Sequence, residues 1–494
     1  MVCLHLHLKL RSGSFNRPEA PPRSHASPGT RSPLRRVRPR PYPPRVSLDN
    51  RPARDEPLTS VDQLVAFLRE GEKPRERFRV GMEHEKIGVL AGGASPIPYA
   101  GERGIEALLS RLPRFGYDLF LEHGRPIAAL QGGLSISLEP GGQLELSGRP
   151  FTCSHDLSRE LRRHLALARA LGAELGHAWL GVGYRPFGSV ADAQWMPKGR
   201  YARMREHLSQ TGALGLDMMT MTATVQANFD FSDEADMARK VRAATLVSPL
   251  VTALFANSPL REGRESGYLS FRTEVWRQTD PARSGLQASA LRPDFGYRAY
   301  AEWALDVPMI FVRRGETYHD PQGRTFRRFL AEGFGGERAT LSDWEDHLTT
   351  LFPEIRLKRV IEVRGADAGT ADMCAALPTL WKGLLYDADA LEAAGKLVAA
   401  GHAELVALSE DVSRRALRAK LGNRTVLELA RELVDIAGAG LHHQQGCGRD
   451  EGRFLEPLRQ IVADGRCPAE LALAKLHGEL GDDPRGLLDH WRIA

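Results

Sequence analysis

The chain is 494 residues long, with 42% hydrophobic residues, 26% charged residues and a formal net charge of +5. This length fits one large domain with an appended helical part as well as two or three separate domains. We find no apolar run long enough to span a bilayer, and residues 1–10 are too short and too rich in histidine for a convincing signal peptide. Five cysteines argue against a disulfide framework and favour a reducing compartment. We therefore expect a cytoplasmic protein with no membrane partner.

The positive charge is concentrated in residues 1–50, which hold ten basic residues against Glu19 and Asp49. This segment carries +8 and the rest of the chain about −3, so we expect no nucleic-acid partner. Residues 1–55 are rich in Pro, Arg and Ser without apolar periodicity, which predicts a disordered tail. Three interpretations stay open: a dispensable tail or early start codon, a transit-like peptide for a plastid-like organelle, and an arm for an anionic partner.

The ordered part is predicted to begin near Pro57, with a Ser or Thr cap and apolar residues at helical spacing over residues 58–68. Residues 79–89 then predict a strand with Glu83 and Glu85 on the same side, because side chains alternate along a strand. Two carboxylates so close repel each other, and a bound cation would relieve that repulsion. The ordinary alternative is a solvated strand edge.

Residues 135–147 alternate polar and apolar side chains around Pro140-Gly141-Gly142, which predicts a β-hairpin with two different faces. The polar face carries Ser135, Ser137, Glu139, Gln143, Glu145 and Ser147. Carboxylates on a rigid pair of strands suit Mg²⁺, which takes oxygen ligands from one or two carboxylates and from the phosphates of a nucleotide.

Further along the chain, helices are predicted over residues 155–172 and 234–254. Between and after them, residues 222–231 predict a strand with Gln226 and Asn228 on a polar face, and residues 358–367 one with Glu362 and Arg364 on one side. Four polar-faced strands predict an α+β fold with an antiparallel sheet, whose exposed face holds carboxylates, amides and cations. Residues 387–494 show Leu and Ala at helical intervals, which predicts a helical C-terminal section packed on a domain of residues 56–386.

Several motifs of other enzyme classes are absent from the sequence. It has no Gly-x-x-x-x-Gly-Lys-Ser/Thr loop, no Gly-x-Gly-x-x-Gly turn, no Gly-x-Ser-x-Gly elbow and no Cys-x-x-Cys pair. A P-loop NTPase and a Rossmann enzyme are therefore unsupported. His442, His443 and Cys447 look like a soft-metal cluster, but the glycines around them predict a loop without a metal.

Eight segments, in this order along the chain, resemble glutamate–cysteine ligases of the plant and proteobacterial type: GMEHEKIGV, SISLEPGGQLELSG, MPKGRYARMREHLSQTGALGLDMM, TVQANFDFSDEADMARKVRA, ALFANSPLREG, ALDVPM, DWEDHLTTLFPEIRLKRVIEVRGAD and ALPTLWKGLLYD. The resemblance implies a fold like the catalytic domain of glutamine synthetase, a curved, mostly antiparallel sheet flanked by helices. It also implies ATP-dependent ligation of L-glutamate to L-cysteine through an acyl phosphate, the first step of glutathione biosynthesis. ATP and Mg²⁺ are then the expected cofactors, small molecules the partners, and a monomer or homodimer the assembly.

The resemblance also implies roles for individual residues. The implied metal ligands are Glu83, Glu85, Glu139, Glu145, Glu362 and Gln226. Arg364 and Lys198 would face the transferring phosphate, and the nucleotide would contact Lys198, Arg200 and Asn228. The implied substrate-binding residues are Arg272, Arg205 and Trp276.

Two departures from the family pattern leave alternatives open. Ile310 and Arg313 stand where the plant type has tyrosines, so a γ-glutamyl ligase with another amine acceptor is an alternative. Cys153 and Cys374 lie close to, but not at, the positions of a paired cysteine in plant members, and we interpret them as unrelated buried thiols. A phosphotransferase of related fold and a non-catalytic binding module are the alternatives from other classes.

Overall fold

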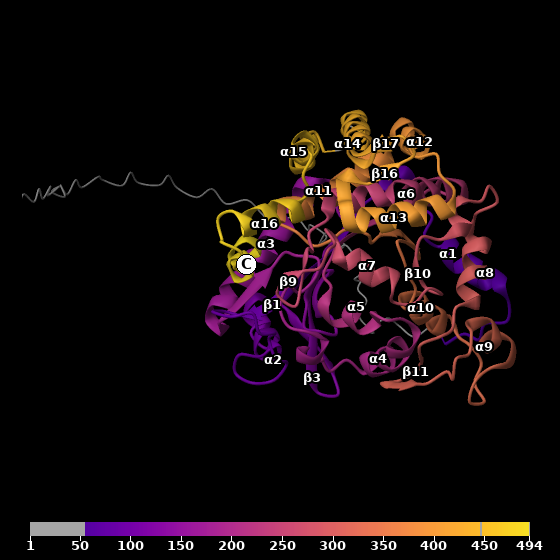
Figure 1. Ribbon diagram of the computed structural model, residues 1–494. Coiled ribbons are helices and arrows are strands. Elements are labelled where there is room, and N and C mark those ends of the chain that lie inside the picture. Colours follow the sequence, from indigo (N-terminus) through magenta and orange to yellow (C-terminus); the bar gives the residue numbers. More distant parts are fainter. Residues whose placement is uncertain (1–54, 445–446, 494) are drawn as a thin grey trace, which may run out of the picture. The chain divides into compact units, whose positions relative to one another are not determined.

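The computed structural model describes residues 55–444 and 447–493, so the predicted tail lies outside the described residues except for Asp55. The described residues belong to one compact unit (Figure 1). A sheet of nine strands lies at its centre: β1 (Val80–Leu90), β2 (Asp118–Glu122), β3 (Arg125–Gln131), β4 (Leu134–Leu138), β5 (Leu144–Ser147), β6 (His177–Leu180), β7 (Val225–Phe229), β14 (Ile355–Leu357) and β15 (Ile361–Val363).

The strand order is β14-β15-β7-β1-β5-β4-β3-β2, and β6 pairs with the far end of β1. Every pairing in this sheet is antiparallel. The described residues also form two-residue and three-residue strands in small ladders: β8 (Leu260–Arg261) with β9 (Arg264–Glu265), β10 (Ser284–Gly285) with β13 (Phe352–Pro353), β11 (Val312–Arg314) with β12 (Thr317–His319), and β16 (Lys420–Leu421) with β17 (Arg424–Thr425). The expected α+β class with a mostly antiparallel sheet is confirmed.

Helices flank the sheet: α1 (Val61–Arg69), α2 (Ile105–Leu109), α3 (Ser154–Leu175), α4 (Gly199–Thr211), α5 (Gly215–Met221), α6 (Glu234–Phe255), α7 (Phe271–Arg277), α8 (Tyr297–Asp306), α9 (Phe326–Glu332), α10 (Leu341–Thr349) and α11 (Ala371–Tyr386). The helices predicted over residues 58–68, 155–172 and 234–254 correspond to α1, α3 and α6. Ser60 is the N-cap of α1, as the cap signal predicted.

The predicted hairpin is formed by β4 and β5, with Ser137 opposite Glu145. Its loop needs glycine at both Gly141 and Gly142. Gly142 has a φ of +82°, which a residue with a Cβ rarely adopts. A Cβ on Gly141 would lie 2.2 Å from the carbonyl oxygen of Thr220, so α5 and the turn approach closely only because this side chain is absent.

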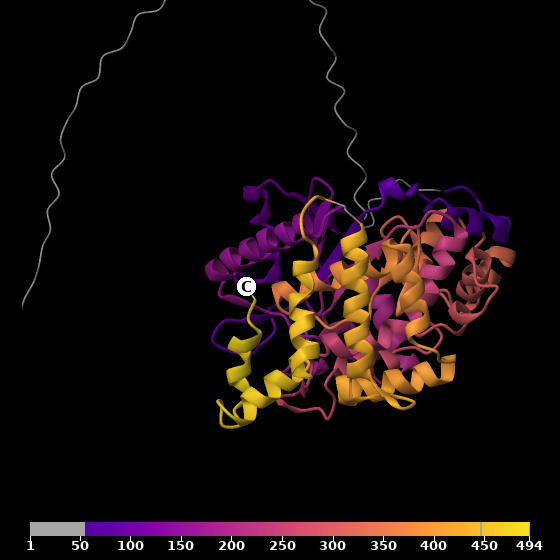
Figure 2. The same cartoon turned by 90° about the horizontal axis from the view of Figure 1, so that it is seen from above.

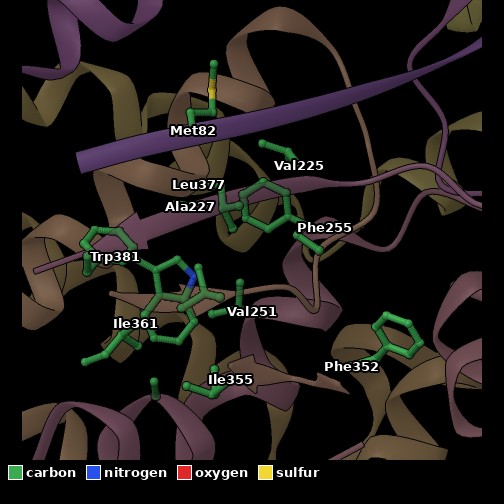
Figure 3. Packing of buried hydrophobic residues seen from close by; sticks show 14 of the residues in the cluster. Met82, Val225, Ala227, Val251, Phe255, Phe352, Ile355, Ile361, Leu377 and Trp381 are labelled. Carbon is green, nitrogen blue, oxygen red and sulfur yellow. The ribbon is translucent and has the colours of Figure 1, made fainter. Parts of the chain in front are cut away.

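The apolar face of the sheet packs on two long helices. Figure 3 shows Met82 of β1 and Ile361 of β15 in this core together with Val251 and Phe255 of α6 and Trp381 of α11. All five side chains are buried. This packing leaves the opposite face of β1, β5, β7 and β15 to the polar side chains that the alternation predicts.

The C-terminal section consists of helices, as predicted, apart from the short β16–β17 ladder. Its helices are α12 (Ala388–Leu397), α13 (His402–Arg415), α14 (Val426–His443), α15 (Glu456–Asp464), α16 (Pro468–His477) and α17 (Leu487–Trp491), drawn in orange and yellow in Figures 1 and 2. α12 and α14 pack against α6. In the part of the chain that the structure describes, no helix has both the length and the apolar character to cross a membrane.

Two predictions near the C-terminal section are wrong. His442 and His443 end α14 instead of lying in a loop, because the apolar spacing of that helix continues through Gly438 and Gly440. Cys153 is not an unpaired thiol, since it forms a disulfide with Cys447 that joins residues 294 positions apart. Cys374 is a free, buried thiol as expected.

Candidate functional site

The central strand β1 sets the geometry of the polar face. Glu83 lies opposite Ser147 of β5 on one side and Gln226 of β7 on the other, and Glu85 lies opposite Glu145. Residues that face each other across antiparallel strands point to the same side of the sheet. The two acidic pairs predicted from separate segments are therefore brought together on one face.

Burial and mutual repulsion act on these carboxylates. Burial, followed by the charges of Glu362 and Glu145, raises the pKa of Glu83 to about 7. Burial and the charges of Glu139 and Glu145 raise the pKa of Glu85 well above its usual value. For Glu139, burial and Glu145 raise the pKa to about 7. Each of these carboxylates would therefore gain stability from a nearby positive charge.

Glu145 is the most firmly held member of this row. Its Oε2 accepts a hydrogen bond from Ser137 Oγ, and its Oε1 accepts one from Ser147 Oγ, both at 2.8 Å. These two serines were predicted on the same face, and they fix the carboxylate between Glu85 and Glu139. Ser135, which also lies on this face, is buried.

The carboxylates form a row and do not converge on one point. Among the described residues, two clusters of His, Cys, Asp or Glu side chains place three possible ligand atoms within 4.8 Å of one another. One consists of Cys153, Cys447 and Glu451, and the other of Asp387, Asp389 and His443. No such group lies on the polar face of the described sheet. A cation on this face would therefore take only one or two protein carboxylates, which is the usual pattern for Mg²⁺ bound to a nucleotide.

Glu362 lies at the centre of a cluster of cations. Arg356 donates to both of its oxygens, at 3.0 and 2.7 Å, Arg364 Nη1 donates at 2.6 Å, and Lys358 Nζ lies 3.1 Å from Oε2. Although burial opposes it, the charges of Arg356, Lys358 and Arg364 hold the pKa of Glu362 well below its usual value. Glu362 thus carries a full negative charge that three cations already balance.

The two amides on β7 take different partners. Gln226 accepts a hydrogen bond from Arg364 Nη1 at 2.8 Å through its side-chain oxygen. Asn228 Nδ2 donates to Glu83 Oε1 at 3.1 Å. Gln226 and Glu362 therefore hold Arg364 from two strands, whereas Asn228 orients the carboxylate of Glu83.

A second pair of cations reaches the other end of the row. Lys198 Nζ donates to the carbonyl oxygen of Leu138 at 2.7 Å, at the end of β4 and next to Glu139. Arg200 Nη2 donates to Thr349 Oγ1 at 3.1 Å. The charges of Lys198 and Arg200 both lower the pKa of Glu139 against the effects of burial and Glu145. Lys198 is the N-cap of α4 and Arg200 lies in the first turn of that helix.

Arg272 and Trp276 of α7 lie at the opposite end, beside Arg364. Arg272 Nη2 donates to the carbonyl oxygen of Arg364 at 2.9 Å, and the Trp276 ring lies under both guanidinium groups, 5.8 and 5.5 Å from their central carbons. The structure does not bring Arg205 to them. Arg205 is exposed on α4, and its guanidinium lies over the ring of Trp195.

Sequence reasoning missed Arg356 and Glu354 as members of the site. Arg356 alternates with Lys358 along the segment before Glu362, so a tight β14–β15 hairpin would have placed it on the same face. Glu354 has no such pattern, because it reaches the site from the turn between β13 and β14. The missing signal is long-range strand pairing, which alternation alone does not contain.

The polar face therefore combines a row of carboxylates with guanidinium and ammonium groups at both ends. Phosphoryl transfer is catalysed mainly by positioning and by neutralising charge, and this face has the groups for both. The side chains on this face are therefore of the kinds that a phosphoryl-transfer enzyme needs.

Comparisons with known proteins identify the family. Residues 79–485 match the family described as glutamate-cysteine ligase family 2 (GCS2). Glutamate–cysteine ligase A, chloroplastic, of Oryza sativa subsp. japonica is 43% identical over 422 residues, which cover 85% of each chain. Glutamate–cysteine ligase, chloroplastic, of Arabidopsis thaliana is 42% identical over 430 residues, covering 86% of this chain and 81% of the relative. This chain belongs to glutamate–cysteine ligase family 2, and the resemblance carried by the sequence motifs is confirmed.

Solved structures are more distant. The crystal structure of glutamate–cysteine ligase from Francisella tularensis in complex with AMP has a TM-score of 0.49 and 14% identity, and the match covers 84% of this chain and 89% of that one. This likeness is too low to bear on the site.

Proposed function

We propose that this protein joins L-glutamate and L-cysteine into γ-glutamylcysteine at the expense of ATP, with ADP and phosphate as the other products. This is the first step of glutathione biosynthesis. The observation that supports it best is the row of Glu83, Glu85, Glu139 and Glu145 between cations on one sheet face, in a chain of this family.

The reaction explains why such a face is needed. A carboxylate is a poor electrophile. An oxygen of the γ-carboxylate of glutamate must therefore first take the terminal phosphoryl group of ATP, which releases ADP. The amine of the acceptor then attacks the carbonyl carbon, loses a proton, and displaces phosphate. We assign to Arg364 and Lys198 the neutralisation of charge on the transferring phosphoryl group, which is the largest contribution a protein makes to this kind of transfer. Arg200 and Asn228 stay candidates for nucleotide contacts.

We propose Glu83, Glu85, Glu139 and Glu145 as ligands of divalent cations, with Mg²⁺ the expected ion. The donor set fits, because carboxylate oxygens are hard ligands for such an ion. Burial and mutual repulsion also raise the pKa values of Glu83, Glu85 and Glu139, which a bound cation would relieve. A bound Mg²⁺ would neutralise charge on the phosphates of ATP. Glu362 and Gln226 also stay candidates, but both are engaged by Arg364, and we assign them the task of positioning it.

Arg272 and Trp276 support an amino-acid subsite next to Arg364. In the described residues, Arg272 Nε and Trp276 Nε1 are buried donors without an acceptor. A substrate carboxylate would supply one, and the planar guanidinium suits it. Arg205 has less support, because it is exposed and stacked on Trp195.

A γ-glutamyl ligase with another amine acceptor is the second candidate. Ile310 is buried in the core and Arg313 Nε donates to Asp346 Oδ2 at 3.1 Å, so neither offers a phenol hydroxyl at the positions where the plant type has tyrosines. This difference affects the acceptor and leaves the activation of glutamate unchanged.

Location and assembly are also proposals. The relatives from Oryza sativa and Arabidopsis thaliana are named chloroplastic, which gives no support to the cytoplasmic expectation and agrees with the plastid-like alternative for residues 1–50. A monomer or homodimer that acts on small molecules stays our expectation.

The deciding experiment is a coupled assay of ADP release with ATP, Mg²⁺, L-glutamate and a panel of amines. We expect rapid ADP release only with L-cysteine, together with stoichiometric γ-glutamylcysteine. Equal release with another amine would favour the second candidate. ADP release that needs no amine and leaves a stable phosphorylated product would contradict both and support a phosphotransferase.

A further inference from the structure

Glu354 is a carboxylate that the proposed reaction does not use. It lies between β13 and β14, where its N–H donates to the carbonyl oxygen of Gly285 at 3.0 Å and its carbonyl oxygen accepts from the N–H of Arg364 at 3.1 Å. Both backbone bonds fix its position beside the site. Its side chain is turned towards α6, where Ser248 Oγ donates to Oε2 at 3.2 Å.

The surrounding backbone leaves room for this carboxylate. A Cβ on Gly365 would lie 2.2 Å from Glu354 Oε2, so any larger residue at that position would displace it. Among the described residues, Ser248 is the only one that donates a hydrogen bond to the carboxylate. Oε2 is thus oriented by Ser248, while Oε1 accepts no hydrogen bond from the described part of the chain.

Glu354 shares a small recess with the residues of the amino-acid subsite. The recess has a volume of about 10 Å³ and is lined by Arg272, Trp276, Glu354 and Arg364, together with Gly285 of β10 and Phe352 and Pro353 of β13. This volume admits one water-sized group, and an ammonium group is of that size. Among the buried donors without an acceptor in the described residues, Arg272 Nε and Trp276 Nε1 belong to residues that line this recess.

We propose that Glu354 binds the α-ammonium group of the amino-acid substrate whose α-carboxylate is held by Arg272 and Trp276. This inference rests on the proposed function and names a specificity-determining residue for it. An α-amino acid carries a negative and a positive group on one carbon atom. Arg272 and Trp276 offer donors for the first, and Glu354 offers an acceptor for the second.

The charges around Glu354 agree with this role. Burial raises the pKa of Glu354, although Arg272, the Ser248 hydrogen bond and Arg364 lower it, so a further positive charge would stabilise the ionised form. Arg364 is already paired with Glu362. Asp367, the other acid nearby, accepts hydrogen bonds from Asn257 N, Ser258 Oγ and Ser270 Oγ and is therefore satisfied without a ligand.

Both proposed substrates are α-amino acids, so the experiment must tell them apart. Isothermal titration in the presence of Mg²⁺ and a non-hydrolysable ATP analogue would compare L-glutamate with glutarate, and L-cysteine with 3-mercaptopropionate. Each analogue lacks only the α-amino group. The proteins would be the wild type, Glu354→Gln, and Glu479→Gln as a matched change at an exposed carboxylate. Gln keeps the shape of Glu354 and the acceptor for Ser248.

We expect the wild type to bind one of the two amino acids about ten- to hundred-fold more tightly than its analogue, which corresponds to the loss of one charged hydrogen bond. Glu354→Gln should remove this preference, because it should weaken the binding of the amino acid and leave the binding of the analogue unchanged. The pair that is affected identifies the substrate. Glu479→Gln should behave as the wild type.

Three results with Glu354→Gln would overturn the proposal. The first is equally weaker binding of an amino acid and its analogue, and the second is an unchanged preference in both pairs. The third is a lower kcat in the ADP-release assay with unchanged affinities, which would make Glu354 a proton acceptor. Ser248→Ala provides a second variant, with a smaller effect in the same direction. The titration needs no turnover. A wild type that shows the preference but no cysteine-dependent ADP release would refute the proposed function and leave this inference standing.

Discussion

Arg364 shows how a side chain at a reaction centre can be fixed before any substrate arrives. Glu362 and Gln226 each accept a hydrogen bond from its Nη1, and the ring of Trp276 lies beneath its guanidinium. Fixing a long, flexible side chain lowers the entropy that must be lost on binding. It also holds the positive charge where it is needed, because preorganised charges act without rearrangement during the reaction.

Replacing Glu85 or Glu139 by Gln tests the metal assignment. Removing a ligand that stabilises charge at the phosphoryl group should lower kcat about 10²- to 10³-fold at saturating ATP. The melting temperature without Mg²⁺ should stay the same or rise, because each change removes one of several buried carboxylates that repel one another. ADP release and thermal unfolding are the measurements, with Glu76→Gln, at an exposed site, as the control. Near-wild-type turnover at saturating Mg²⁺ would refute the assignment.

Replacing Arg272 by Lys tests the amino-acid subsite. Lys keeps the positive charge but loses the planar fork, so the KM of an amino-acid substrate should rise about ten- to hundred-fold, and that of ATP much less. The family pattern points first to cysteine and then to glutamate. Steady-state kinetics with each substrate varied in turn decides between them, and thermal unfolding checks the loss of the Arg364 contact. An effect confined to ATP would move Arg272 to the nucleotide site.

The place of a single residue could be predicted where the alternation of side chains along a strand alone decides which face of the sheet it lies on. Glu83, Glu85, Glu139 and Glu145 share one surface because a strand has a period of two, which can be read from the sequence. Arg356 and Glu354 could not be found in this way. They reach the site through the pairing of β14 with β15 and of β13 with β10, and such pairing depends on contacts far apart in the chain.

At the scale of elements, the sequence predicted the long helices better than the sheet. α1, α3 and α6 have caps and helical spacing within the segment itself, so their existence follows from local signals. The order of the strands does not, since β1 lies between β5 and β7, more than fifty residues away in each case. The strands β2, β3 and β6 were not predicted at all, because their exposed and buried residues do not alternate regularly.

The disulfide between Cys153 and Cys447 ties the start of α3 to the segment after α14. Cross-links of this kind stabilise a fold mainly by restricting the unfolded chain, typically by about 2–4 kcal/mol. Cys447→Ser should therefore lower the melting temperature under non-reducing conditions. The same variant measured with a strong reductant is the control, because both proteins then lack the cross-link. A difference of equal size in both conditions would show that the disulfide is not the cause.

For the whole molecule, acid sensitivity should come from histidines that are buried in the neutral form. His347 Nε2 lies 2.8 Å from the carbonyl oxygen of Ala304, and its ring stacks on Phe326. Burial lowers the pKa of His347 from 6.5 to about 3, a hydrogen bond to Ala304 opposes this, and the charge of Arg283 adds to it. His164 is buried on α3, and burial together with Lys86 and His84 lowers its pKa in the same direction.

The sign of the effect follows from these shifts. Between pH 6.5 and 3 the unfolded chain binds a proton at His347 that the folded chain does not, so stability is present above pH 6.5 and is lost as the pH falls. His347→Gln should be less stable than the wild type at pH 8 but lose less stability on acidification. The difference between the two losses should reach roughly 2 kcal/mol at pH 5, at about 1.4 kcal/mol per pH unit. Denaturant unfolding from pH 8 to pH 5 measures it, with His319→Gln at an exposed site as the control. Equal slopes for the wild type and His347→Gln would show that other groups control the acid sensitivity.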